Sequence, residues 1–316
     1  MRKQIASFIT AFILLLIIYY LIAFSIDETQ PSTPVQHFVR TQGTGFVLGD
    51  QPFKFIGTNL NLDSLKSLDQ KSQKQSIKDL VFNGGLSRIL VYRIAVDPNN
   101  IIDAFLLDQL VSNCEVYSCY VLVSFDGLSL DDPELYKNRL DPFINKYQKS
   151  RAIFAWEVSN GPLRYGTDPI IPNDFLDNII SFIKSTDQNH LVIAGSGTFD
   201  SSHGPASFIQ YRLSQATSDF CVFSLDTESS TPKDIWSNRL KDSFKSLSDC
   251  NGKPVVLEYF SISSKMNDQS TRYSTLFEQA SINNINPLFS YWSSDNDELS
   301  VYTTDKEILS AISDYY

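Results

Sequence analysis

Short apolar runs recur along most of the chain, and longer segments with an amphipathic pattern separate them. The runs are almost continuously apolar, as expected for parallel strands that are buried on both faces. One intervening segment begins at Asn173, a good N-cap, and places Phe175, Ile179 and Ile183 at helical spacing. Another helical pattern covers 234–247. We predict eight strands, at 53–58, 88–94, 120–125, 153–158, 191–195, 220–225, 254–258 and 287–291.

Eight strands that alternate with helices over about 260 residues predict a (β/α)8 barrel, the TIM-barrel fold. At the start of the predicted barrel, the strand-like triplets 46–48 (FVL) and 53–55 (FKF) flank the turn 49–52, which predicts an N-terminal β-hairpin. A doubly wound open sheet is the alternative fold. It should show a glycine-rich phosphate turn after the first strand, and residues 58–61 (TNLN) do not provide one.

The amino terminus carries an uncharged run from Ile5 to Ile26, preceded by Arg2 and Lys3. A membrane-spanning helix needs about 20 such residues, whereas the core of a signal peptide has about 7–15. We therefore predict a transmembrane anchor in 1–26, with a signal segment cleaved after Ser25 as the alternative. A polar linker follows at 27–35, and the barrel occupies 36–316. Either interpretation places the barrel outside the cytoplasm, membrane-anchored or secreted.

Composition and charge narrow the classes of partner. The net charge of −10 argues against nucleic acid, whose binders need a basic stripe, and against peripheral binding to an anionic membrane. The four cysteines form no CxxC pair, so we expect no structural zinc site. In an oxidising space Cys114 and Cys119 can pair, as can Cys221 and Cys250. The alternative is four small buried thiols.

Polar residues gather where the predicted strands end, and in a barrel of this type the carboxyl ends of the strands form the functional face. Aromatic residues lie beside them, at Trp156, Tyr259, Tyr291 and Trp292. Carboxylates next to aromatic rings suit sugars, although ordinary packing explains the pattern equally well. The polar strand-end residues are Asn59, Arg93, Asp97, Asp126, Asn160, Asp226, Glu228, Glu258, Asp295 and Asp297.

Two strings carry a family resemblance. Residues 151–162 read RAIFAWEVSNGP and residues 252–261 read GKPVVLEYFS, and both resemble strand motifs of the β-mannanases of glycoside hydrolase family 5. Residues 38–59, 86–93 and 190–195 are similar to other family strands, in family order. The resemblance implies a retaining glycosidase, in which two carboxyl groups about 5–5.5 Å apart act as acid/base and nucleophile. It implies no metal or cofactor.

The sequence departs from the family at both catalytic positions. Gly161 stands where the acid/base glutamate is expected, and the gapless alignment puts Tyr259 at the nucleophile position. Glu157 matches a non-catalytic glutamate of the family. In this alignment Glu258 points away from the mouth of the barrel, and a one-residue slip would turn it inward. Arg93 and Asn160 match family residues that position the nucleophile and the sugar.

These departures predict a catalytically inactive mannanase-like barrel that binds a polysaccharide, an oligosaccharide or a surface partner. One alternative is an active glycoside hydrolase that uses Glu258 as the nucleophile and a relocated acid, such as Asp126, Asp226 or Glu228. A third interpretation is a structural or protein-interaction domain. The residues predicted to bind sugar are Arg93, Asn160, Trp156, Asp226, Tyr259 and Trp292.

Overall fold

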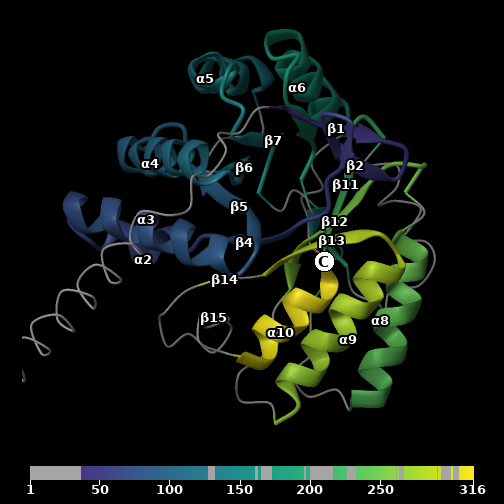
Figure 1. Cartoon of the computed structure of the whole chain (residues 1–316). Coiled ribbons are helices and arrows are strands. Elements are labelled where there is room, and N and C mark those ends of the chain that lie inside the picture. Colours follow the sequence, from purple (N-terminus) through teal and green to yellow (C-terminus); the bar gives the residue numbers. More distant parts are fainter. Residues whose placement is uncertain are drawn as a thin grey trace, which may run out of the picture. The chain divides into compact units, whose positions relative to one another are not determined.

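The computed structural model divides the chain into two units, Met1–Thr33 and Pro34–Tyr316, and all described residues belong to the second (Figure 1). The predicted anchor in 1–26 and the whole of the predicted linker, 27–35, lie outside the described residues. Among the described helices, none is long and apolar enough to cross a membrane. The described residues are 37–126, 132–160, 163–164, 173–195, 197–199, 216–225, 233–248, 250–260, 262, 267–289, 291–292, 300–301 and 306–316.

Eight parallel strands form a nearly closed barrel, which confirms the predicted fold class. Each strand lies close to a predicted apolar run; the largest shift is at the first, which begins at 56 rather than 53. The strands pair in the order β11-β12-β13-β4-β5-β6-β7-β9. They are β4 (Ile56–Asn59), β5 (Ile89–Val96), β6 (Tyr120–Phe125), β7 (Ile153–Glu157), β9 (Leu191–Ile193), β11 (Cys221–Leu225), β12 (Val255–Phe260) and β13 (Ile285–Phe289).

The barrel is joined between β9 and β11 by the residues that precede β11. The backbone N–H of Asp219 donates to the carbonyl of Val192 over 2.9 Å, and the Ser218 hydroxyl accepts from the backbone N–H of Ala194 over 2.9 Å. Two short strands, β8 (Leu163–Arg164) and β10 (Gly197–Phe199), extend the sheet beside β11. These contacts close the barrel between β9 and β11, the two strands at the ends of the eight-strand pairing order.

A small antiparallel sheet precedes the barrel, made of β1 (Val39–Gln42), β2 (Gly45–Leu48) and β3 (Gln51–Pro52). The predicted hairpin is present as β2 and β3, with β1 as an additional strand. The ring of Phe46 packs against the rings of Phe55, Phe154 and Phe220 at centroid distances of 5.2–5.5 Å. The sheet therefore covers the amino-terminal end of the barrel, and the chemistry is left to the opposite end.

Helices surround the strands (Figure 1). Several begin at residues whose side chains cap the free N–H groups of the first turn, among them Asp69, Asn100 and Asp132. Helix α6 begins at the predicted Asn173. The helices are α2 (Leu62–Lys66), α3 (Gln70–Leu86), α4 (Ile101–Tyr117), α5 (Pro133–Tyr147), α6 (Asn173–Thr186), α8 (Lys233–Leu247), α9 (Gln269–Ile282) and α10 (Lys306–Tyr315).

Both expected cysteine pairs are disulfides. Cys114 in α4 is bonded to Cys119, which precedes β6, and Cys221 in β11 is bonded to Cys250. All four residues are buried. The first bond closes the connection between α4 and β6, and the second ties β11 to the segment after α8. The alternative of four buried thiols is wrong.

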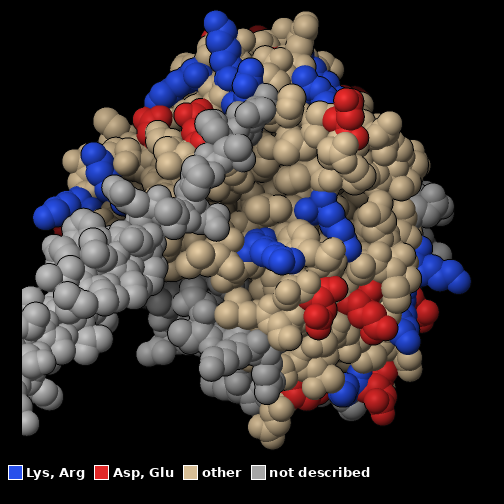
Figure 2. Space-filling view, in the orientation of Figure 1, with Lys and Arg blue, Asp and Glu red and all other residues tan. Residues whose placement is uncertain are grey.

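The face that carries the β1–β2 sheet shows acidic and basic side chains in separate small groups (Figure 2). The chain as a whole carries a net charge of −10. The described part of this face therefore carries no single large acidic patch, despite the negative net charge of the chain.

Candidate active site

Strand β12 presents Glu258 to the interior of the barrel. Val256 belongs to the inner apolar cluster and Leu257 to the cluster between strands and helices, so alternation turns Glu258 inward. Phe260 returns to the outer cluster, three residues after Leu257. The prediction that Glu258 points away from the mouth is therefore wrong.

A β-bulge explains this geometry. Phe223 of β11 pairs with Leu257, but the next residue, Ser224, pairs with Tyr259. On the other side of β12, the three steps from Leu257 to Phe260 are matched by only two steps along β13. The extra residue places Glu258 and Tyr259 together between two outward-facing neighbours. No one-residue slip is needed to bring Glu258 inward, and Tyr259 is partly exposed beside it.

Arg93 lies between two buried glutamates. Its Nε donates to Oε2 of Glu157 over 2.8 Å and lies 3.0 Å from Oε1 of Glu258. Its Nη2 donates to Oε1 of Glu157 over 2.9 Å. Both glutamates are completely buried and Arg93 is 7 % exposed. One guanidinium thus fixes the carboxyl groups of β7 and β12 from the intervening β5.

Three neutral side chains complete the surroundings of Arg93. Asn59 at the end of β4 accepts from Nη1 over 3.1 Å, and Ser124 in β6 accepts from Nη2 over 3.2 Å. Asn160 accepts from Nη2 over 2.9 Å. The amide of Asn59 also donates to the backbone carbonyls of Glu258 and Phe289 over 2.8 Å each. The guanidinium is therefore pre-oriented by four strands and the loop after β7.

Burial and charge shift the ionisation of this cluster. Burial alone would lower the pKa of Arg93, but the carboxyl groups of Glu157 and Glu258 outweigh it and raise that pKa. Burial raises the pKa of Glu157 to about 8; the guanidinium of Arg93 opposes the rise and Glu258 adds to it. The site therefore stays cationic at Arg93, while Glu157 takes up a proton near neutral pH.

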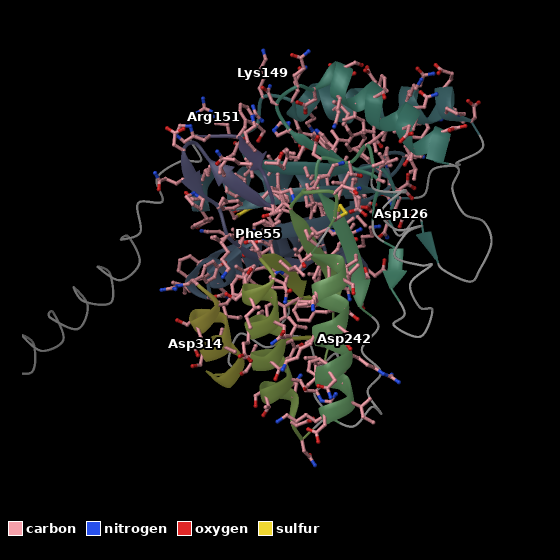
Figure 3. All side chains as sticks on the ribbon, turned by 90° about the vertical axis from the view of Figure 1, so that its right-hand side faces the viewer. Phe55, Asp126, Lys149, Arg151, Asp242 and Asp314 are labelled. Carbon is pink, nitrogen blue, oxygen red and sulfur yellow. A yellow bond between two sulfur atoms is a disulfide. The ribbon has the colours of Figure 1, made fainter. Side chains whose placement is uncertain are left out.

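An exposed carboxylate extends the cluster toward solvent. Asp126 follows β6, and its Oδ2 accepts from the amide of Asn160 over 3.3 Å. Figure 3 shows Asp126 at one end of the barrel and Arg151, which precedes β7, at the other. Burial, with the charges of Glu157 and Asp126, raises the pKa of Tyr136 from α5. Among the described residues, Asp126 is thus an exposed acidic residue that is linked through Asn160 to Arg93 and its two buried glutamates.

Trp156 does not lie at the mouth, contrary to the prediction. It points outward from β7, is completely buried, and stacks on Phe125 with ring centroids 5.9 Å apart. Its indole N–H donates to Asp187 over 2.8 Å. Because Glu157 faces inward, its neighbour Trp156 must face the helices. This tryptophan is a packing residue of the outer layer.

The remaining predicted residues fall into two groups. Asp97 belongs to the turn before α4, where its carboxylate accepts from the backbone N–H of Asn99 over 2.8 Å. Tyr291 and Trp292 form the short strand β14 (Tyr291–Trp292), which pairs with β15 (Ser300–Val301). The other group lies outside the described residues: Gly161, Asp226, Glu228, Asp295 and Asp297.

Sequence reasoning missed two members of the cluster, Ser124 and Glu157. Ser124 is a polar residue in the apolar run 120–125, two residues beyond the inward-facing Leu122. Glu157 stands in the same relation to Ala155. Period-two alternation within each strand would have placed both side chains inside the barrel.

Comparison with known proteins gives sequence relatives and structural neighbours, whereas no family model matches the chain. The mannan endo-1,4-β-mannosidase A of Aspergillus aculeatus is 23% identical over 279 residues, which cover 74% of each chain. The endo-β-1,4-mannanase of Thermotoga petrophila superposes with a TM-score of 0.63 at 16% identity, over 84% of this chain and 77% of its own.

The catalytic domain of an endoglucanase from Thermobifida fusca superposes equally well, with a TM-score of 0.63 at 13% identity, over 88% of this chain and 96% of its own. At such identities the superpositions establish the fold, while the sequence match carries the relationship to mannanases. The resemblance drawn from the sequence is confirmed: this chain carries a barrel similar to that of the β-mannanases of glycoside hydrolase family 5.

Proposed function

We propose that the barrel binds a β-1,4-mannan-type polysaccharide at the carboxyl ends of its strands and hydrolyses it with Glu258 as the nucleophile. The observation that carries this proposal is the contact between Glu258 and Arg93 inside the barrel, 3.0 Å from Oε1 to Nε. The sequence relatives, which are named as mannan endo-1,4-β-mannosidases, support the substrate class.

The nucleophile of a retaining glycosidase must be an ionised, well-oriented carboxylate. The positive charge of Arg93 favours the ionised form of a neighbouring carboxyl group. Asn59 holds the backbone carbonyl of Glu258 and also accepts from Arg93, so strand and guanidinium are fixed together.

Hydrolysis also needs a general acid, and glycine at position 161 supplies none. Asp126 is the described candidate, because Asn160 binds it and Arg93 with opposite ends of one amide. The exposed carboxyl group of Asp126 therefore contacts Asn160, the residue that precedes the family's acid/base position in the sequence. In the proposed reaction Asp126 protonates the leaving oxygen while Glu258 attacks the anomeric carbon and forms a glycosyl ester. Water then attacks that carbon and gives its proton back to Asp126, which releases the sugar and frees Glu258.

A second candidate is a barrel that binds the glycan and does not hydrolyse it. Two observations favour it: Gly161 stands at the acid/base position, and Glu258 is 0 % exposed. General acid catalysis contributes about 10²–10⁴-fold to such a reaction, so its loss alone would leave turnover very slow. Binding and turnover rest on different residues, so a barrel of this kind can retain affinity for a sugar after the chemistry is lost.

The location of the barrel belongs to the same proposal. We infer that residues 5–26 anchor it, or direct its secretion, so that it works outside the cytoplasm. The disulfides Cys114–Cys119 and Cys221–Cys250 support this, because such bonds persist in oxidising compartments.

Hydrolysis of β-1,4-manno-oligosaccharides, with cellulose and β-1,3-glucan oligosaccharides as comparisons, tests the proposal on the full chain. Glu258→Gln should abolish measurable turnover, whereas the matched Glu134→Gln on exposed α5 should leave it unchanged. Turnover that survives Glu258→Gln removes Glu258 from the reaction.

Gly161→Glu separates the two candidates, since a restored acid should raise turnover by about 10²–10⁴-fold. Affinity for manno-oligosaccharides without turnover in the native chain would establish the binding-only candidate. Absence of both affinity and turnover would leave a structural or protein-interaction domain.

A further inference from the structure

Two buried carboxyl groups share one N–H of Arg93. Oε2 of Glu157 and Oε1 of Glu258 lie 2.8 Å and 3.0 Å from the same Nε atom. That nitrogen carries a single proton, and its hydrogen bond goes to Glu157. Both carboxyl groups are completely buried. The ion pair with Glu258 is therefore close in distance but is not a directed hydrogen bond.

The two oxygens of Glu258 have no hydrogen-bond donor among the described residues. The nearby donors are already used: Arg93 donates twice to Glu157, and the hydroxyl of Tyr136 donates to the carbonyl of Val158. The amide of Asn59 donates to backbone carbonyls. A fully buried carboxylate with no donor is strongly disfavoured. Two such anions beside one cation also leave a net buried negative charge.

We propose that Glu157 and Glu258 hold one proton between them, and that Glu157 is the positioning residue that donates it to Glu258. A protonated Glu157 supplies the missing hydrogen bond to Glu258 while its oxygens still accept from Arg93. The three groups are then neutral together, one cation against one anion. This arrangement keeps the negative charge on Glu258, the residue that the proposed function uses.

Electrostatics agree with this geometry. The pKa of Glu157 is raised to about 8, by burial and by the nearby carboxyl of Glu258, against the opposing effect of Arg93. Among the described residues, Tyr136 from α5 lies within the electrostatic influence of Glu157 and of Asp126 after β6, and Tyr259 follows Glu258 in the chain.

The proton shared by Glu157 and Glu258 should make the free energy of unfolding depend on pH. A carboxyl group whose pKa is higher in the folded than in the unfolded chain makes its full contribution to stability only at low pH. Here that means a pH below about 4.3, the pKa of glutamate in the unfolded chain. That contribution is lost as the pH rises through the folded value. We therefore expect the free energy of unfolding to fall between about pH 5 and pH 8 because of this pair. Only the role of Glu258 as a nucleophile rests on the proposed function; the shared proton does not depend on it.

Infrared spectroscopy of the full chain tests the proton directly. At pH 6 exposed carboxyl groups are ionised, so the carbonyl band of a protonated carboxyl reports the buried pair. We expect this band at pH 6 and its loss above pH 8. Glu157→Gln should abolish the band and flatten the decline of the unfolding free energy, since the amide mimics the protonated acid. Glu258→Gln should do the same.

Asp103→Asn is the matched control. Asp103 is also a buried carboxyl, but it belongs to a separate ion pair, with 2.7 Å between its Oδ1 and Nζ of Lys66. The band and the pH dependence should survive in this variant. A native chain with no protonated carboxyl at pH 6, or a band that persists in both glutamine variants, would overturn the proposal. Neither result depends on hydrolysis, so a chain without activity would still show the shared proton.

Discussion

Arg93 reaches Glu258 across the interior of the barrel, from β5 to β12, and the two strands are not neighbours in the sheet. The sheet order places β13 and β4 between them, so the contact of 3.0 Å spans the space inside the strands. Glu157 meets the same guanidinium from β7. One cation therefore holds together strands from both halves of the chain.

Replacement of Arg93 by Met should lower the free energy of unfolding by about 3–5 kcal/mol, the usual effect of removing one partner of a buried ion pair. The loss arises because both glutamates are then buried without a cation. Urea denaturation at pH 7 measures it.

A compensated variant tests the electrostatic origin of that loss. Arg93→Met/Glu157→Gln/Glu258→Gln carries no buried charge at this place and should recover much of the stability. If the triple variant is as unstable as Arg93→Met alone, the arginine acts through packing of its aliphatic part and the electrostatic explanation fails.

The barrel was predictable because each strand is a short apolar run buried on both sides. The run 120–125, for example, is β6 with unchanged bounds. Helix α6 begins at Asn173, where the sequence combines a capping residue with apolar positions at helical spacing. Such signals are local, and the chain order of a (β/α)8 barrel then fixes most of the topology.

The candidate site was less predictable because facing depends on the neighbouring strands. The bulge at Glu258 and Tyr259 appears only when β12 is placed against β11 and β13. A sequence alignment does not show how the residues of one strand pair with those of its neighbours, so it cannot reveal a bulge. Trp156 was misplaced for a simpler reason: its neighbour Glu157 faces inward, and two successive residues of a regular strand cannot share a face.

Two tryptophans should respond differently to substitution. Trp156→Phe removes the indole N–H that Asp187 accepts, and we expect a loss of about 1–3 kcal/mol in stability with unchanged affinity for manno-oligosaccharides. Trp292→Ala should instead weaken that affinity by about 2- to 10-fold, the range for an aromatic contact. Thermal unfolding and calorimetric titration of the same samples measure both. If Trp156→Phe binds manno-oligosaccharides more weakly than the native chain, Trp156 takes part in binding, as the sequence predicted.

The two disulfides should contribute unequally to stability. Cys221 and Cys250 are 29 residues apart, whereas Cys114 and Cys119 are 5 apart. In the chain-entropy description the longer loop gives about 3–4 kcal/mol and the shorter about 2 kcal/mol. Denaturant titration of Cys221→Ala/Cys250→Ala and of Cys114→Ala/Cys119→Ala compares them. Equal losses would contradict an entropic origin.

Asp187 should set part of the acid sensitivity of the fold. Hydrogen bonds from His190 and Trp156 outweigh the effect of burial and hold the pKa of Asp187 below its ordinary value. A carboxyl with a lowered pKa stabilises the fold above its unfolded value of about 3.9, and this contribution disappears as the pH falls through the folded value. Asp187→Asn should therefore be less stable than the native chain at pH 6.

That difference should shrink as the pH falls below about 4, because the carboxyl of the unfolded chain then takes up its proton before that of the folded chain does. Urea unfolding at pH 6 and at pH 3 measures it, with Asp242→Asn on the exposed surface of α8 as the control (Figure 3). The control should track the native chain at both values. A deficit of Asp187→Asn that stays constant from pH 6 to pH 3 would show that the variant loses packing or geometry, because a purely structural loss has no reason to follow the protonation of one carboxylate.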